Sequence, residues 1–239
     1  QKQYRQLLTV LRTDIDILED HLRRRDYTFD YAKQPGQAML KYWQAFLRND
    51  GERYSDYMEQ VRAGQAMLKT GTLYPYEVIR PCLQRLSEAK RQVLETTWRA
   101  LPDYTGGENA LVVADGSGSM YSWNNAQPAL TALSLAIYFA QRNQGAFHNH
   151  FITFSMRPQL VEIKGRDIYE QVRTCASYNE VANTNLQAVF DLILRTACKH
   201  RLSQAELPQT LYIISDMEFD SCAANAGVTN FEQARERYA

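Results

Sequence analysis

The segment that most constrains the fold is a short apolar run that ends in a loop of Asp, Gly and Ser. The run covers residues 110–114 and continues as the pentapeptide DGSGS at residues 115–119. Its length and its Ala, Leu and Val content are typical of a parallel strand covered on both faces. The two glycines allow the backbone to turn sharply after the strand. We therefore predict a buried strand that ends in an oxygen-rich loop.

This loop carries three hard oxygen ligands at alternate positions, on Asp115, Ser117 and Ser119. An extended or curved loop can direct all three toward one point. Such oxygens suit Mg²⁺, which prefers octahedral oxygen ligation at about 2.0–2.1 Å and keeps some of its water. The pattern Asp-x-Ser-x-Ser is a weak signal alone, because clusters of Gly, Ser and Asp after strands are usually plain turns.

Two later segments are expected at the same edge of the sheet. Residues 181–185 precede a helical apolar pattern, which places Thr184 in a loop at a helix start. Residues 211–216 form a second apolar run, and this run ends in Ser and Asp216. Parallel strands of an α/β sheet share one carboxyl face, so both segments should emerge beside Asp115.

With these residues the chain resembles the von Willebrand factor A domain over residues 108–239. The metal-ion-dependent adhesion site of that family has Asp-x-Ser-x-Ser, then a distant Thr, then a distant Asp. The resemblance implies Mg²⁺, or Mn²⁺ or Ca²⁺, with an open coordination position that takes an acidic side chain of a partner protein. The implied metal residues in this sequence are Asp115, Ser117, Ser119, Thr184 and Asp216.

Short phrases elsewhere carry a narrower resemblance. Residues 38–42, 74–79 and 214–220 look like an uncharacterised family in which a helical region precedes a von Willebrand A-like domain. That layout is similar to the Ro autoantigen, where a helical-repeat module called TROVE precedes the same kind of domain. The TROVE module binds small structured RNAs, so the resemblance implies RNA as an alternative partner of the helical half.

The first half of the chain is helical by its pattern. Apolar residues recur at spacings of three and four between residues 4 and 18, which predicts one apolar helix face. The phrase Gln-Ala-Met-Leu occurs at residues 37–40 and again at 65–68, each time after Gly, which indicates paired helical units. Further helices are predicted over residues 35–48, 52–69, 75–82 and 84–100.

The second half alternates strands and helices, which predicts an α/β fold. A helical region, 1–104, is followed by a doubly wound, Rossmann-like sheet of the von Willebrand A type, 108–239. We expect this sheet to lack its last strands, because that family has two more after the strand at 210–215, and we expect a chain beginning at Gln1 to be a fragment. Strands are predicted at 110–115, 149–154, 158–163 and 210–215, and helices at 127–142, 166–174, 185–199 and 230–238.

Amino-acid composition says little about which class of partner the chain binds. The chain has 27 basic and 27 acidic residues, and residues 1–104 hold 17 and 14 of them, too mild an asymmetry to argue for nucleic acid. The run Arg23, Arg24 and Arg25 could contact phosphate, but such runs are more often solvated helix ends. Nine of the 15 tyrosines lie in 1–104, where they either stack bases or, as we favour, pack between helices.

Location follows from two further compositional features. No apolar run approaches the ~20 residues that a membrane-spanning helix needs. The four cysteines are scattered without a CxxC pair, which favours a reducing compartment and therefore a cytoplasmic protein.

Catalytic alternatives are weaker. His148 and His150 could share a strand face as zinc ligands, but no third ligand is evident. Ser117 lacks both the Gly-x-Ser-x-Gly elbow and a His base. Asp115 and Asp216 could imitate a metal-dependent phosphatase pair, yet hydroxyl-rich ligation leaves the ion electrophilic, which suits carboxylate capture better than water activation.

We therefore predict a non-catalytic, divalent-cation-dependent protein-binding or scaffolding module. The alternative is a ribonucleoprotein component that binds structured RNA through its helical half. A metal-dependent hydrolase is the less favoured third function.

Overall fold

A computed structural model describes residues 3–4, 8, 17–121, 127–178 and 185–216. The predicted helix at 230–238 and most of the first helical pattern lie outside this part of the chain. The chain forms two compact units. One unit groups Ser87–Pro102 with the chain up to Tyr74, and the other groups Pro75–Leu86 with the chain from Asp103 onward.

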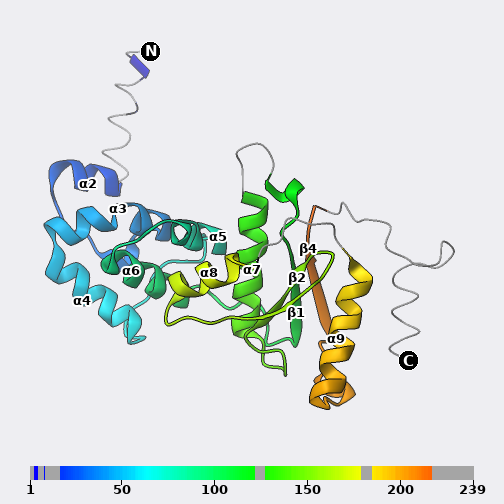
Figure 1. The fold of residues 1–239 in the computed structure, drawn as a ribbon. Coiled ribbons are helices and arrows are strands. Elements are labelled where there is room, and N and C mark those ends of the chain that lie inside the picture. Colours follow the sequence, from blue (N-terminus) through cyan, green and yellow to red (C-terminus); the bar gives the residue numbers. More distant parts are fainter. Residues whose placement is uncertain (1–2, 5–7, 9–16, 122–126, 179–184, 217–239) are drawn as a thin grey trace. The chain divides into compact units, whose positions relative to one another are not determined.

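The first unit is built from helices (Figure 1), and aromatic side chains make up much of its core. The rings of Tyr31 and Phe46 have centroids 5.3 Å apart, and Tyr54 lies 5.4 Å from each of them. Three tyrosines of the first half, Tyr31, Tyr54 and Tyr57, are therefore core residues rather than an exposed stacking surface. The elements are α2 (Leu18–Arg24), η1 (Tyr31–Lys33), α3 (Gly36–Asn49), α4 (Gly51–Arg62) and α6 (Glu88–Arg99).

Helix α4 ends seven residues before the predicted end at residue 69. The backbone N–H of Gly64 donates to the carbonyl of Val61 at 3.1 Å, and that of Gln65 donates to Gln60 at 2.8 Å. These two bonds form a Schellman motif, which needs a left-handed residue after the helix. Gly64 supplies it with a φ of 72°. The predicted helix is too long because it runs through the glycine that ends α4.

The two copies of Gly-Gln-Ala-Met-Leu adopt different structures. Residues 36–40 begin α3, whereas residues 64–68 follow the end of α4 and are not helical. The paired helical units predicted from this repeat are therefore wrong. Gly36 is required for a different reason from Gly64, because a Cβ at Gly36 would lie 2.4 Å from the carbonyl oxygen of Lys69. The same residues thus start one helix, where Gly36 packs on Lys69, and follow another, where Gly64 forms the left-handed cap.

The second unit contains a four-stranded mixed sheet in the order β3-β2-β1-β4. Strand β1 is parallel to β2 and β4, and β2 is antiparallel to β3. Asp115 pairs with Phe154, and Ala114 pairs with Ile214, so the carboxyl ends of three strands meet at one edge. The strands are β1 (Ala110–Asp115), β2 (His150–Phe154), β3 (Leu160–Glu162) and β4 (Thr210–Ile214).

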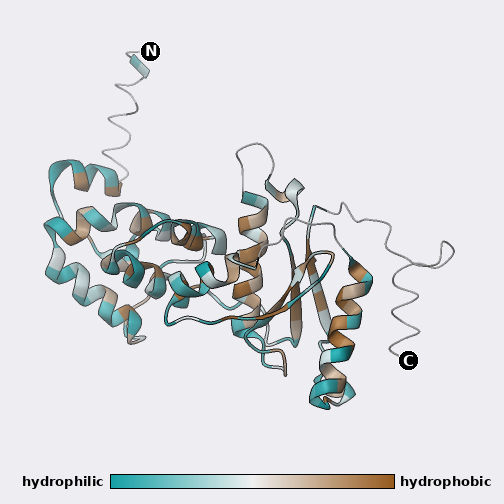
Figure 2. Ribbon diagram, in the orientation of Figure 1, coloured by the Kyte–Doolittle hydropathy of each residue, from teal (hydrophilic) through white to brown (hydrophobic). Residues whose placement is uncertain are grey.

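Helices cover both faces of this sheet, which confirms the predicted mixed α/β, Rossmann-like fold (Figure 1). On one face Leu111 and Val113 pack with α9 (Leu186–His200). On the other face α7 (Gln127–Arg142) packs on β1, and its Phe139 ring lies 5.0 Å from that of Tyr212. Every residue of β1 is buried, and Figure 2 shows the apolar residues concentrated on the strands and along α7.

The segment Pro75–Leu86 belongs to the sheet unit, although it falls within the range predicted as the helical domain. It forms α5 (Pro75–Ile79) and η2 (Arg80–Leu83), which pack on α7 and on α8 (Ile168–Ala176), respectively. Its side chains Val78, Ile79 and Cys82 are fully buried there. Within the described chain, no helix has both the length and the apolar character of a membrane span.

Candidate metal centre

Asp115 is a buried carboxylate at the carboxyl end of the central strand. Its residue is 2% exposed. The Oδ1 atom accepts a hydrogen bond from the backbone N–H of Ser117 at 2.7 Å, and Oδ2 accepts one from the hydroxyl of Ser215 at 2.6 Å. A carboxylate has about four acceptor positions, so these two bonds leave acceptor capacity on both oxygens.

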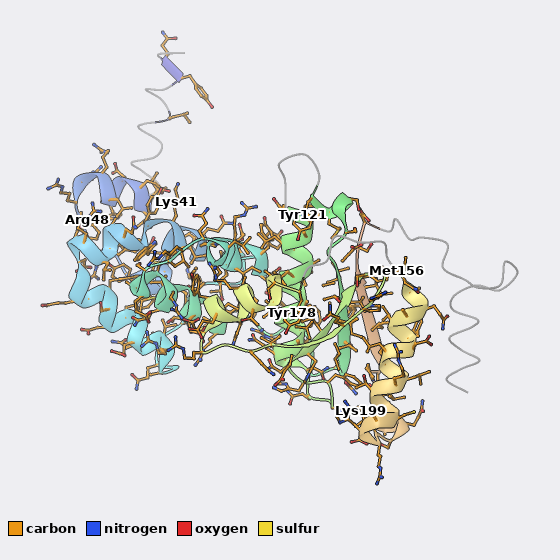
Figure 3. The ribbon with its side chains drawn as sticks, in the orientation of Figure 1. Lys41, Arg48, Tyr121, Met156, Tyr178 and Lys199 are labelled. Atoms are coloured by element: carbon orange, nitrogen blue, oxygen red, sulfur yellow. The ribbon has the colours of Figure 1, made fainter. Side chains whose placement is uncertain are left out.

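Two hydroxyls stand next to this carboxylate in the loop that follows β1. The Oγ atoms of Ser117 and Ser119 are 3.0 Å apart, with Ser117 half-buried and Ser119 exposed. The turn η3 (Gly118–Tyr121) shapes the loop, and the N–H of Met120 donates to the carbonyl of Ser117 at 3.2 Å. Figure 3 labels Tyr121, the last residue of this turn, near the carboxyl ends of the strands. The structure therefore brings Asp115, Ser117 and Ser119 into one cluster.

The other two predicted ligands are Asp216 and Thr184. Asp216 is exposed and directly follows Ser215, the residue that bonds Asp115. Thr184 lies outside the described residues. The cluster thus contains three of the predicted residues, and a fourth lies next in sequence to a residue that contacts it.

Ser215 is a member of this cluster that the sequence analysis missed. Leu211 and Ile213 pack with Leu111 and Val113 on the α9 face of the sheet, and Ser215 continues the same alternation. The pairing of Ala114 with Ile214 then sets Ser215 opposite Asp115. The alternation was readable in the sequence, but the register between strands about 100 residues apart was not.

Ser155 is a second polar residue that was not predicted at this edge. It directly follows β2, is 1% exposed, and its hydroxyl has no hydrogen-bond partner in the part of the chain that the structure describes. Buried polar groups are normally paired, so an unpaired one here adds hydrogen-bonding capacity to the carboxyl edge of the sheet.

The electrostatics of Asp115 set it apart from an ordinary structural acid. Both of its hydrogen-bond donors are neutral, and no Lys or Arg of the described chain forms an ion pair with it. A buried carboxylate without a counter-charge is unfavourable unless positive charge is supplied. Among the described residues no group of three or more His, Cys, Asp or Glu could hold a metal, so any ion here depends on hydroxyl oxygens as well.

The two histidines considered as zinc ligands lie elsewhere. His150 starts β2, at the edge opposite to the one where Asp115 lies. The Nδ1 of His148 is 2.7 Å from the carbonyl of Asn143, and the Nδ1 of His150 is 2.7 Å from the carbonyl of His148. Both rings are thus held by backbone carbonyls.

The basic run Arg23, Arg24 and Arg25 lies at the C-terminal end of α2. Arg23 and Arg24 pair with the carboxylate of Asp20 at 2.7 and 2.5 Å, and Arg25 is the left-handed C-cap. The hydrogen bond from Arg23 helps hold the pKa of Asp20 below its usual range. Positive charge at a helix C-terminus is favoured by the helix dipole, so this run has a structural explanation.

Comparison with known families agrees with the two-part chain. Residues 109–239 match the family described as "Domain of unknown function (DUF7788)". This match covers more than half of the chain, which therefore belongs to that family. Residues 1–104 match a second family, "Domain of unknown function (DUF2828)".

One similar protein is "Uncharacterized protein L728" of Acanthamoeba polyphaga mimivirus, 28% identical over 255 aligned residues. The alignment covers 99% of this chain but 44% of the viral protein, so the chain spans less than half of that relative. No solved structure matches the chain.

Proposed function

We propose that the sheet unit is a non-catalytic, divalent-cation-dependent protein-binding module of the von Willebrand A type. One observation carries this proposal. The buried carboxylate of Asp115 ends the central strand, its donors among the described residues are neutral, and the hydroxyls of Ser117 and Ser119 lie in the loop that follows. The strand order and the common carboxyl edge of β1, β2 and β4 support the same assignment.

In this proposal Mg²⁺ is held by Asp115, Ser117 and Ser119, with Asp216 acting directly or through water. Thr184 is included as a fifth ligand because the resemblance to the von Willebrand factor A domain implies it. The oxygen donors fit a hard cation, and the ion supplies the positive charge that no described residue supplies to Asp115. Because most of these ligands are neutral, the bound ion stays electrophilic and takes the carboxylate of an acidic side chain on the partner.

Capture of partners on the immobilised chain tests this function. We expect at least one protein to be retained in Mg²⁺ and released by chelator, and to be lost with Asp115→Ala. Changing the acidic residue of that partner to its amide should release it as well. If Asp115→Ala retains the same chelator-sensitive partners as the parent, the proposed site is wrong.

The alternatives predict different results. RNA binding through the helical half predicts a steep salt dependence, whose slope falls by about one unit for each phosphate group that the protein no longer neutralises. The triple change of Arg23, Arg24 and Arg25 to Ala measures this by filter binding. We expect no change, because Asp20 already pairs with two of these arginines. A metal-dependent hydrolase predicts chelator-sensitive turnover of a phosphate ester by the same preparation.

A further inference from the structure

The loop that follows β2 places two exposed side chains beside the proposed ion site. Asp115 pairs with Phe154 in the parallel ladder, where neighbouring strands lie about 4.8 Å apart. Met156 is two residues beyond Phe154, so its Cα lies no more than about 12 Å from that of Asp115, whatever the loop conformation. Met156 is 48% exposed, and Arg157 next to it is exposed as well. This edge of the sheet thus carries an apolar and a cationic group close to the candidate metal centre.

The same loop is fixed at its base. The backbone N–H of Thr153 donates to the carbonyl of Gln159, and the N–H of Gln159 donates to the hydroxyl of Thr153, both at 3.0 Å. Thr153 is itself buried. Pro158 directly follows Arg157, and proline both fixes its own φ and favours extended backbone in the residue before it. A loop ordered in this way loses little conformational freedom when a partner binds.

Arg157 has no acidic partner within the described chain. Its guanidinium forms neither an ion pair nor a hydrogen bond with any residue that the structure describes. Lys164, the next cation along the chain, instead pairs with Glu162 at 2.8 Å. A planar guanidinium can bind a carboxylate through two parallel hydrogen bonds. Arg157 can therefore bind a second acidic side chain on a partner whose first one is held by the ion.

An exposed aromatic side chain follows the hydroxyl loop on the neighbouring strand. Tyr121 ends η3, two residues after Ser119, and is 38% exposed. Figure 3 labels Tyr121 and Met156 at the end of the sheet unit where the strands finish. Single exposed apolar residues are ordinary, but Tyr, Met and Arg are residue types enriched in protein interfaces. Tyr121, Met156 and Arg157 together therefore form a contact surface around the candidate metal centre.

We propose that this edge binds a short acidic segment of the partner protein that carries a large apolar residue and a second acidic residue. The first acidic side chain binds the ion at Asp115, the apolar one packs on Met156 and Tyr121, and the second acidic one pairs with Arg157. A distance of about 12 Å corresponds to about four residues of extended chain, so one segment can make all three contacts. The inference rests on the proposed function, because the ion holds the first of these side chains.

Selection from a displayed random peptide library on the immobilised full chain tests this. Peptides that bind in Mg²⁺ and are eluted by chelator should contain an acidic residue with a large apolar residue and a second acidic residue within about four positions. Selection on Arg157→Gln should lose the preference for the second acidic residue. Selection on Met156→Ser should lose the preference for the apolar one.

Two matched variants control for loss of a charge or of an apolar side chain. Lys199→Gln removes an exposed cation that Figure 3 labels at the opposite end of the sheet unit from Met156. Met67→Ser removes a methionine of the helical unit that is 81% exposed. Both should select the same peptides as the parent. All four side chains are exposed, so the urea midpoints of the variants should match that of the parent.

Affinity for the most enriched peptide gives the quantitative reading. Arg157→Gln and Met156→Ser should each bind it about three- to tenfold more weakly than the parent, and added salt should weaken the parent more than Arg157→Gln. If the chelator-eluted peptides share a single acidic residue and no other preference, this inference is wrong and the proposed function stands. If the parent yields no chelator-eluted peptide, the proposed function is contradicted and the inference with it.

Discussion

Asp50 in the helical unit and Asp115 in the sheet unit are carboxylates held in opposite ways. Asp50 accepts a hydrogen bond from Nε of Arg53 at 2.8 Å and one from the hydroxyl of Tyr31 at 2.9 Å, and Nη2 of Arg53 lies 2.7 Å from the same carboxylate as an ion pair. The side chain of Asp50 is 20% exposed. Asp115 is far more buried, yet its donors are an amide and a hydroxyl. The structural acid has its counter-charge within the unit. Asp115 has none among the residues that the structure describes, as expected of a site whose positive charge is a bound ion.

The largest effect should follow removal of the counter-charge of Asp50. Arg53→Met keeps an apolar stem but loses both contacts with Asp50 and the bond from Nη1 to the carbonyl of Phe29 at 3.0 Å. We expect the free energy of unfolding to fall by about 2–4 kcal/mol in urea denaturation. Added Mg²⁺ should not restore it. A loss below about 0.5 kcal/mol would mean that Asp50 does not depend on this pairing.

A smaller but opposite pair of effects should follow removal of each negative charge. Asp50→Asn loses charge-assisted bonds and should cost about 1–2 kcal/mol. Asp115→Asn keeps an oxygen for the N–H of Ser117, and its amide can donate to the hydroxyl of Ser215. Because it also removes an uncompensated buried charge, we expect the metal-free protein to change by less than about 0.5 kcal/mol or to gain stability. Urea titrations in chelator measure both, and an equal loss in the two variants would contradict the comparison.

The smallest effect concerns acid stability of the helical unit. Hydrogen bonds from the hydroxyl and then the backbone N–H of Thr28, followed by one from His21, lower the pKa of Asp26 to about 2. A carboxyl whose pKa is lower in the folded state stabilises the fold fully above its unfolded value of about 4, and this contribution disappears as the pH falls toward 2. Asp26→Asn should therefore flatten the pH dependence of the urea midpoint between about pH 4 and 2. If the pH dependence of the urea midpoint between about pH 4 and 2 is unchanged in the variant, these donors do not stabilise the charged carboxyl.

The sequence predicted the elements whose signal is local. The helix expected at 127–142 is α7 with the same bounds, and the strand at 110–115 is β1, because apolar periodicity is set by neighbours in sequence. The end of α4 was missed although Gly64 marked it. The repeated Gly-Gln-Ala-Met-Leu phrase gave a wrong prediction, since Gly36 packs against the distant carbonyl of Lys69, whereas Gly64 takes the left-handed conformation that ends α4.

The candidate site was only partly predictable for a similar reason. The loop containing Asp115 could be identified from its composition, because the hydroxyls are only two and four residues away. Ser215 joins it through strand register, and Ser155 is distinguished by burial without a partner. Packing between distant segments likewise places Pro75–Leu86 in the sheet unit. It also buries the hydroxyls of Tyr54 and Thr96 without a partner among the described residues. No local pattern encodes such contacts.

The most direct test of the central claim is calorimetric titration of Mg²⁺ into the chelator-treated full chain and into Asp115→Asn. The parent should bind one ion saturably, and a parallel melting curve should show stabilisation of about 2.7 kcal/mol once the free ion reaches a hundredfold excess over its dissociation constant. Asp50→Asn should bind the ion as the parent does, whereas Asp115→Asn should show no saturable heat. Equal binding by the parent and Asp115→Asn, or no binding by either, would contradict the account.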